Sequence, residues 1–215
     1  MTTAPPHTDL PTSFCNESEE KAYKAVLATF GRMFPVHRML ANVILPTGDV
    51  RGPKTSEYDL MFICSGGIFI FEVKGWRNGT LKSAKDEGGQ HVWSIERPDG
   101  SSEPISDPIA QGGFKVRYLL EELKGIHTTQ YVLCTEDNLS VDLGCNAHAV
   151  HINDLPYLAR NSRATARKFY SQYEIDEATV NAVADTILQL ASVHTPGEHI
   201  ANVSRWVKAK ATAAA

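Results

Sequence analysis

Three ionisable side chains interrupt the most apolar stretch of this sequence, residues 56–76, SEYDLMFICSGGIFIFEVKGW. Asp59 precedes a first apolar run, whereas Glu72 and Lys74 stand at the end of a second run. Continuous apolar runs of this length are typical of strands that are buried on both faces. Burying an unpaired charge in such a strand costs free energy or shifts the pKa of the group. The three side chains are therefore candidates for a functional site.

A Gly66-Gly67 pair separates the two runs and predicts a two-residue hairpin turn, because glycine tolerates a positive φ at both positions. A turn at these residues makes Asp59 face Lys74 and places Glu72 diagonally from Asp59. Since side chains alternate along a strand, all three charged groups emerge on one face of the sheet. A loop one residue longer would instead turn Glu72 to the opposite face.

Two carboxylates beside an amine are a set of groups suited to cutting phosphodiesters. Carboxylate oxygens prefer hard cations such as Mg²⁺ or Mn²⁺. A bound dication polarises a phosphoryl oxygen and lowers the pKa of a coordinated water, and Lys74 would stabilise the charge that develops. The alternative is structural, with an ion pair between Asp59 and Lys74 and a solvated Glu72.

The order of these residues resembles a known family. Asp59 followed by Glu72-Val73-Lys74 is similar to the PD-(D/E)XK nuclease signature, and T-S-E-Y-D with G-G-I-F-I-F-E-V-K-G-W resembles the nuclease-related domain (NERD) family. The resemblance implies a restriction-endonuclease-like fold and Mg²⁺-dependent DNA cleavage. It implies that Asp59 and Glu72 hold the metal with the Val73 carbonyl, and that Lys74 is catalytic. Glu57 is a further carboxylate on the same predicted face.

Members of that family carry an acidic residue in an N-terminal helix. Here residues 18–34 are predicted to form that helix, with Ser18 as its N-cap. Its apolar face is formed by Tyr23, Val26, Leu27 and Phe30. The spacing to these residues favours Glu20 as the family glutamate, whereas a helical wheel places Glu19 nearer the apolar face. Without the resemblance, both simply favour a helix start.

A second helix carries a candidate glutamine. Asp107-Pro108-Ile109-Ala110-Gln111 resembles the family's N-P-x-x-Q segment, with Asp107 in place of asparagine. Asp107 is a good N-cap and Pro108 a good first helical residue, and Gly125 is predicted to end the helix. The resemblance implies that Gln111 positions the water or a phosphate oxygen. A lone glutamine would otherwise be a surface residue.

Length and composition indicate one domain, or two small domains at most. The chain has 215 residues, of which 42% are hydrophobic. We expect a tail over residues 1–12, a nuclease domain over 13–193 and a helical or flexible tail over 194–215. No CxxC pair is present among the four cysteines, and His148 and His151 are predicted to lie on opposite faces of a strand. We therefore expect reduced thiols, no zinc site, no membrane span and a cytoplasmic protein.

The pattern of elements predicts a three-layer α/β/α fold with a central mixed sheet. Helices are expected at 18–34, 108–124, 153–159 and 176–192. Strands are expected at 40–45, 58–74 as the hairpin, 79–82, 91–96, 130–135 and 149–152.

Charge gives only partial support for DNA as the partner, because the net charge is −4 whereas many DNA-binding proteins are basic overall. Basic residues gather in two groups that could contact phosphates without reading sequence. One group is Arg160, Arg163, Arg167 and Lys168, and the other is Lys115, Arg117 and Lys124. The chain has no motor motif of its own, so a separate helicase or another protein is a candidate partner. The competing interpretations are a non-catalytic DNA-binding or protein-interaction module, and a nuclease acting on RNA or on a small phosphoester.

Overall fold

A computed structural model describes residues 14, 16–48, 53–85, 88–89, 91–142, 148–169 and 175–213. The described residues do not include the predicted tail at residues 1–12 or the cysteines Cys15 and Cys145. The side chains of Arg167 and Lys168 also lie outside what is described. The helices are α1 (Glu17–Met33), α2 (Pro108–Glu122), η1 (Ile152–Asp154), α3 (Leu155–Phe169), α4 (Glu177–Ala191) and α5 (Pro196–Ala213). The strands are β1 (His37–Pro46), β2 (Thr55–Cys64), β3 (Gly67–Lys74), β4 (Gly79–Lys85), β5 (His91–Glu96), β6 (Ser102–Ile105), β7 (Thr128–Cys134), β8 (Leu139–Asp142) and β9 (Ala149–His151).

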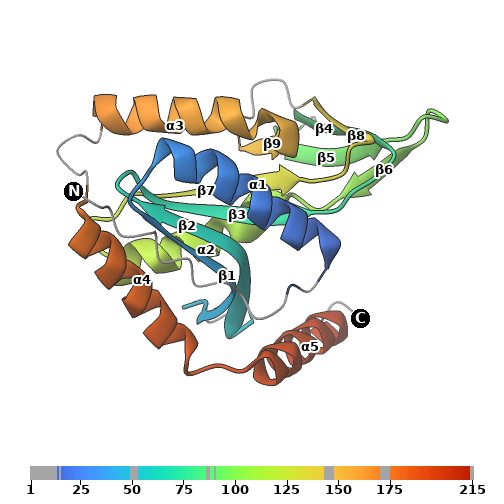
Figure 1. The fold of residues 1–215 in the computed structure, drawn as a ribbon. Coiled ribbons are helices and arrows are strands. Elements are labelled where there is room, and N and C mark those ends of the chain that lie inside the picture. Colours follow the sequence, from blue (N-terminus) through green and yellow to red (C-terminus); the bar gives the residue numbers. More distant parts are fainter. Residues whose placement is uncertain are drawn as a thin grey trace.

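The predicted three-layer α/β/α architecture is confirmed (Figure 1). The main sheet is mixed and has five strands in the order β1-β2-β3-β7-β9, of which β3, β7 and β9 run parallel. One core joins α1 and α3 to one face of this sheet, and a second core joins α2 and α4 to the other face. A second sheet of four strands, β6-β5-β4-β8, extends from the side of the molecule (Figure 1).

Helix α1 begins one residue earlier than predicted, and its N-cap is Asn16 rather than Ser18. The Asn16 side chain accepts a hydrogen bond from the Glu19 amide at 3.0 Å, which satisfies one of the free amides of the first turn. Phe30 anchors the buried face: its ring lies 5.3–5.4 Å from the rings of Phe62, Phe69 and Phe71. These edge-to-face contacts fix α1 over β2 and β3.

The β2–β3 hairpin turns at Ser65 and Gly66, not at Gly66 and Gly67, so the predicted register was wrong by two residues. Cys64 pairs with Gly67, and the ladder runs to the pair Leu60–Phe71. Gly67 needs its hydrogen because its φ is +108° and a Cβ there would lie 2.2 Å from the His127 carbonyl oxygen. A slip of two residues preserves the face of every side chain, so the predicted faces are retained.

Helix α2 starts as predicted. Asp107 is the N-cap and accepts hydrogen bonds from the amides of Ile109 and Ala110, and Pro108 is the first helical residue. The helix ends at Glu122 with Leu123 as the C-cap, so Gly125, the predicted cap, lies two residues beyond the observed one. Gly125 has a φ of +86°, which places the change of direction after the cap.

Several elements differ from the prediction. Strands β6 and β8 were not expected, and α3 runs to Phe169 rather than to Ala159. Strand β6 contains the polar sequence SEPI and pairs only with β5 at the edge of its sheet, so it lacks the apolar alternation that marks a strand. Along the described residues, no helix has the length and apolar character needed to cross a membrane.

Candidate active site

A cavity of about 590 Å³ opens on the α2 face of the main sheet, at the ends of β2 and β3. Strand β2 supplies Glu57 and Asp59, β3 supplies Glu72, and the first turns of α2 supply Gln111 and Lys115. The opposite wall comes from α5. Its complete lining is Thr47, Pro53, Thr55, Ser56, Glu57, Asp59, Glu72, Gln111, Gly112, Phe114, Lys115, His199, Val203 and Trp206.

Asp59 and Glu72 share this cavity because β2 and β3 carry them on the same face. Extending the observed register by one residue places Asp59 level with Glu72, as direct rather than diagonal neighbours. Asp59 Oδ2 accepts a hydrogen bond from the Val73 amide at 2.7 Å. Burial, together with the negative charge of Glu72, raises the pKa of Asp59 to about 6.

Glu72 lies between two ammonium groups. Lys74 Nζ donates to one carboxylate oxygen at 2.9 Å, and Lys115 Nζ donates to the other oxygen. Burial alone would raise the pKa of Glu72, but the positive charges of Lys115 and Lys74 outweigh it and lower the pKa below its usual value. Glu72 therefore stays ionised beside an Asp59 that titrates near neutrality.

Lys115 lies in the cavity and pairs with Glu72. From the sequence it was predicted only as one of the basic residues that could contact phosphates. Its side chain is only 8% exposed, and its ammonium lies over the Tyr58 ring, 5.4 Å from the ring centre. The Tyr58 hydroxyl donates to the Lys115 carbonyl at 3.1 Å, which ties α2 to β2. Lys115 follows Gln111 by four residues, so both side chains lie on one face of α2. This spacing is the sequence signal that could have placed Lys115 in the site.

The glutamates of α1 do not reach this cavity. Glu20 pairs with Lys24 on its own helix and its side chain is 47% exposed, and Glu19 accepts a hydrogen bond from the Asn16 amide group. Neither lines the cavity that holds Asp59 and Glu72. The structure therefore brings together Asp59, Glu72, Lys74 and Gln111 of the predicted site, whereas Glu20 stands apart.

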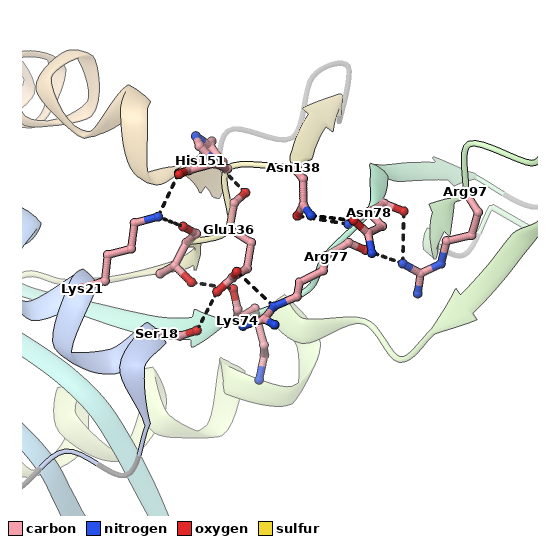
Figure 2. Close-up of polar contacts among 11 residues, drawn as sticks. Ser18, Lys21, Lys74, Arg77, Asn78, Arg97, Glu136, Asn138 and His151 are labelled. Atoms are coloured by element: carbon pink, nitrogen blue, oxygen red, sulfur yellow. Dashed lines mark hydrogen bonds and ion pairs between the residues drawn. The ribbon is translucent and has the colours of Figure 1, made fainter.

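A different polar network holds the start of α1 against the end of β7 (Figure 2). Ser18 donates to Glu136 at 3.0 Å, and Arg77 pairs with the other oxygen of Glu136 at 3.0 Å. Lys21 donates to the Thr135 carbonyl at 2.6 Å and pairs with Asp137. Ser18 thus positions the helix through its side chain, although it is not the N-cap.

The histidine pair is engaged in structural hydrogen bonds. His151 Nδ1 accepts from the Asn153 amide, and its Nε2 lies 3.1 Å from the Glu136 carbonyl oxygen. His148 Nδ1 lies 3.1 Å from the Gln130 carbonyl oxygen, and its ring stacks against Tyr131. Both rings have backbone partners that hold them in the fold.

Asp59 and Glu72 are the carboxylates of the cavity that could bind Mg²⁺ together. Within the described ranges, no three side chains of His, Cys, Asp or Glu lie close enough to hold one metal ion together. Mg²⁺ does not need three, because it keeps several waters and is commonly bound through one or two carboxylates. Asp59 and Glu72 provide two neighbouring carboxylates, and burial together with the charge of Glu72 raises the pKa of Asp59. The pair fits a hydrated Mg²⁺ ion or Mn²⁺.

Helix α5 was predicted only as part of a C-terminal tail, yet it forms a wall of the site. His199 Nδ1 forms a hydrogen bond with Thr55 Oγ1 at 3.0 Å, so α5 is joined to the start of β2. Val203 and Trp206 follow at helical spacing and line the same cavity. The α5 segment contains no catalytic motif, so the sequence alone does not predict that it contributes to the site. Its contribution depends on the tertiary contact between His199 and Thr55.

Comparison with known proteins supports the resemblance. The family model of the nuclease-related domain matches residues 16–135, which contain α1, the hairpin, α2 and β7. No curated protein and no solved structure matches the chain. The match spans more than half of the sequence and includes Asp59, Glu72, Lys74, Gln111 and Lys115. The chain therefore belongs to the nuclease-related domain (NERD) family.

Proposed function

We propose that this protein is a Mg²⁺-dependent DNA endonuclease with weak sequence specificity. The observation that carries the proposal is that Asp59, Glu72 and Lys115 line one cavity and that both Lys74 and Lys115 pair with the Glu72 carboxylate. When bound, the dication would polarise the phosphoryl oxygen and supply an activated water. The described part of the site shows no arrangement for reading base edges, so contacts to phosphates would dominate binding.

Each side chain has a role that follows from its position. Asp59 and Glu72 would hold the ion, and the Val73 amide fixes the orientation of Asp59 through its hydrogen bond. Lys74 would stabilise the negative charge that develops at the phosphorus. Lys115 holds Glu72 in place from a buried position on α2. Gln111, exposed at the mouth of the cavity, would orient the water or a phosphate oxygen.

Cleavage of supercoiled plasmid with Mg²⁺ or Mn²⁺ tests the proposal. Wild type should nick or linearise the plasmid, and Asp59→Ala, Glu72→Ala and Lys74→Ala should each lose activity by about 10²-fold or more. Asp137→Ala is the matched control, because this carboxylate is exposed, pairs with Lys21 and lies away from the cavity. Its activity should equal that of wild type. Circular dichroism should show that all four variants remain folded.

A binding module that does not cleave is the second candidate, and one observation favours it. Glu72 is already neutralised by two lysines, so the protein balances its charge without a metal. A wild type that binds DNA but stays inert with both Mg²⁺ and Mn²⁺ would establish this alternative. Activity on RNA is tested by the same assay with an RNA oligonucleotide of matched sequence.

A further inference from the structure

The cavity has two chemically different walls. The sheet and α2 present carboxylates and Lys115, whereas α5 presents His199, Val203 and Trp206. Phe114 of α2 adds a second aromatic ring to the lining. A site that cut only the phosphate backbone from outside would have no need of this apolar, aromatic side. The lining instead suits a ligand that is anionic at one end and flat and apolar at the other.

The size of the cavity limits that ligand. A volume of about 590 Å³ lies within the range of sites that enclose a single small molecule. Such a space can hold a short stretch of one nucleic-acid strand but not the paired bases of a duplex, so cleavage of supercoiled plasmid would occur where its two strands separate locally. Enzymes that act on a nucleotide inside a pocket require a single strand or take the nucleotide out of the stack.

Helix α5 is positioned to remain as a wall while a ligand binds. The hydrogen bond between His199 and Thr55 anchors the first turn of α5 to β2, and Thr55 is itself buried. The inward side chains His199, Val203 and Trp206 are partly buried, whereas Ile200 and Val207 of the same helix are 65% and 52% exposed. The two sides of α5 are thus distinct, and only one of them meets the cavity.

We propose that the cavity binds a single-stranded nucleic acid, with a base packed against Trp206 and the adjacent phosphate directed to Asp59 and Glu72. Base–aromatic stacking is tolerant of sequence because every base has a flat π-face. The proposal rests on the proposed function, since it names the form of the substrate at the same site. It makes Trp206, outside the segment matched by the family model, a residue that selects the strand form.

The test is fluorescence anisotropy with a short dye-labelled DNA strand and its matched duplex, in Ca²⁺ at fixed ionic strength. Wild type should bind the single strand at least about 10-fold more tightly than the duplex, and Trp206→Ala should weaken single-strand binding by about 5- to 100-fold. Trp206→Phe should retain most of the affinity. Ile200→Ala, on the outward side of α5, is the matched control and should bind like wild type.

The outcomes separate this inference from the proposed cleavage. Equal affinity for strand and duplex, no binding of either, or an unchanged Trp206→Ala would overturn the inference, even if plasmid cleavage with Mg²⁺ is found. Preferential binding that depends on Trp206 supports the inference even if no cleavage occurs, and in that case the catalytic proposal fails instead. A Trp206→Ala variant that melts like wild type excludes unfolding as the cause.

Discussion

Asp59 and Glu72 are neighbours in one cavity, but their pKa values shift in opposite directions. Asp59 rises from 3.8 to about 6, so between these pH values the folded state holds more protons than the unfolded state. Stability from this group is therefore lost as the pH rises from about 4 to about 6. Glu72 behaves oppositely: its pKa is lowered, so its contribution is present above its ordinary pKa and is lost on acidification.

Replacing Asp59 by asparagine should stabilise the metal-free protein at neutral pH. Asparagine keeps an oxygen for the Val73 amide but removes the buried charge next to Glu72. The expected gain is on the order of 1–3 kcal/mol at pH 7, and it should shrink as the pH falls toward 4. Urea unfolding in EDTA at several pH values measures it.

Asp137→Asn provides a control of opposite sign, because hydrogen bonding and ion pairing with Lys21 lower the pKa of Asp137. That variant should be no more stable than wild type at pH 7. If Asp59→Asn were less stable than wild type at pH 7, the combined cost of burying the Asp59 charge and placing it beside Glu72 would be contradicted. A difference that does not change with pH would contradict the raised pKa of Asp59.

Lys115 and Glu72 should show strong energetic coupling. Lys115→Met removes a buried ammonium and leaves Glu72 with Lys74 alone, which should cost about 1–3 kcal/mol. In a Glu72→Gln background the same change should cost much less, because no carboxylate remains to be neutralised. A double-mutant cycle from chemical denaturation gives the coupling, and two additive single effects would show that the ion pair contributes nothing.

At the level of secondary structure, the β2–β3 hairpin shows what the sequence can and cannot predict. Alternation along the strands correctly put Asp59, Glu72 and Lys74 on one face. The predicted register is wrong because the turn consists of Ser65 and Gly66 rather than of the Gly-Gly pair. Gly67 is instead required at the first position of β3, where a Cβ would collide with the His127 carbonyl. That collision comes from a segment about sixty residues away in the chain, which local turn rules do not include.

Helix α2 reaches the site through a second glycine contact that the sequence did not reveal. A Cβ on Gly112 would lie 1.9 Å from Gln130 Nε2 of β7, so the helix packs there without a side chain between. This close approach lets Lys115, three residues later, reach Glu72. Gly113 has no atom within 4 Å of the corresponding position. Gly112 therefore allows α2 to pack closely against β7, whereas Gly113 does not take part in this contact.

A Cβ at position 112 would collide with the buried end of the Gln130 side chain, so Gly112→Ala should shift that side chain or α2 and weaken the contact between Lys115 and Glu72. The expected destabilisation is about 1–3 kcal/mol, together with a loss of nuclease activity. Gly113→Ala is the matched control and should be neutral or stabilising by about 0.5–1 kcal/mol, because alanine favours a helix more than glycine does. Thermal melting and plasmid cleavage compare the two variants. Equal effects from both would show that the contact with Gln130 does not position the helix.

In the whole molecule, the helices that carry the two predicted basic groups, α3 and α2, lie on opposite faces of the main sheet. The net charge is −4, and the arginines of α3 lie in the layer on the opposite side of the main sheet from the cavity. Arg163 of that group contacts the Met33 sulfur, and Arg160 is exposed. Arg160 and Arg163 of this group therefore do not line the cavity. Lys115 of the other group is inside the site and paired.

An acidic molecule whose cavity contains Glu57, Asp59 and Glu72 should repel DNA until a dication binds there. We therefore expect DNA affinity to rise by about 10-fold or more when Ca²⁺ replaces EDTA at constant ionic strength, since the ion adds the largest local charge. Asp59→Asn should lose most of this increase, whereas Asp137→Asn should keep it. Anisotropy titrations with labelled DNA measure the effect. Affinity that is equal in EDTA and Ca²⁺ would favour the non-catalytic binding module, because such a module has no need of an ion between its carboxylates and a phosphate.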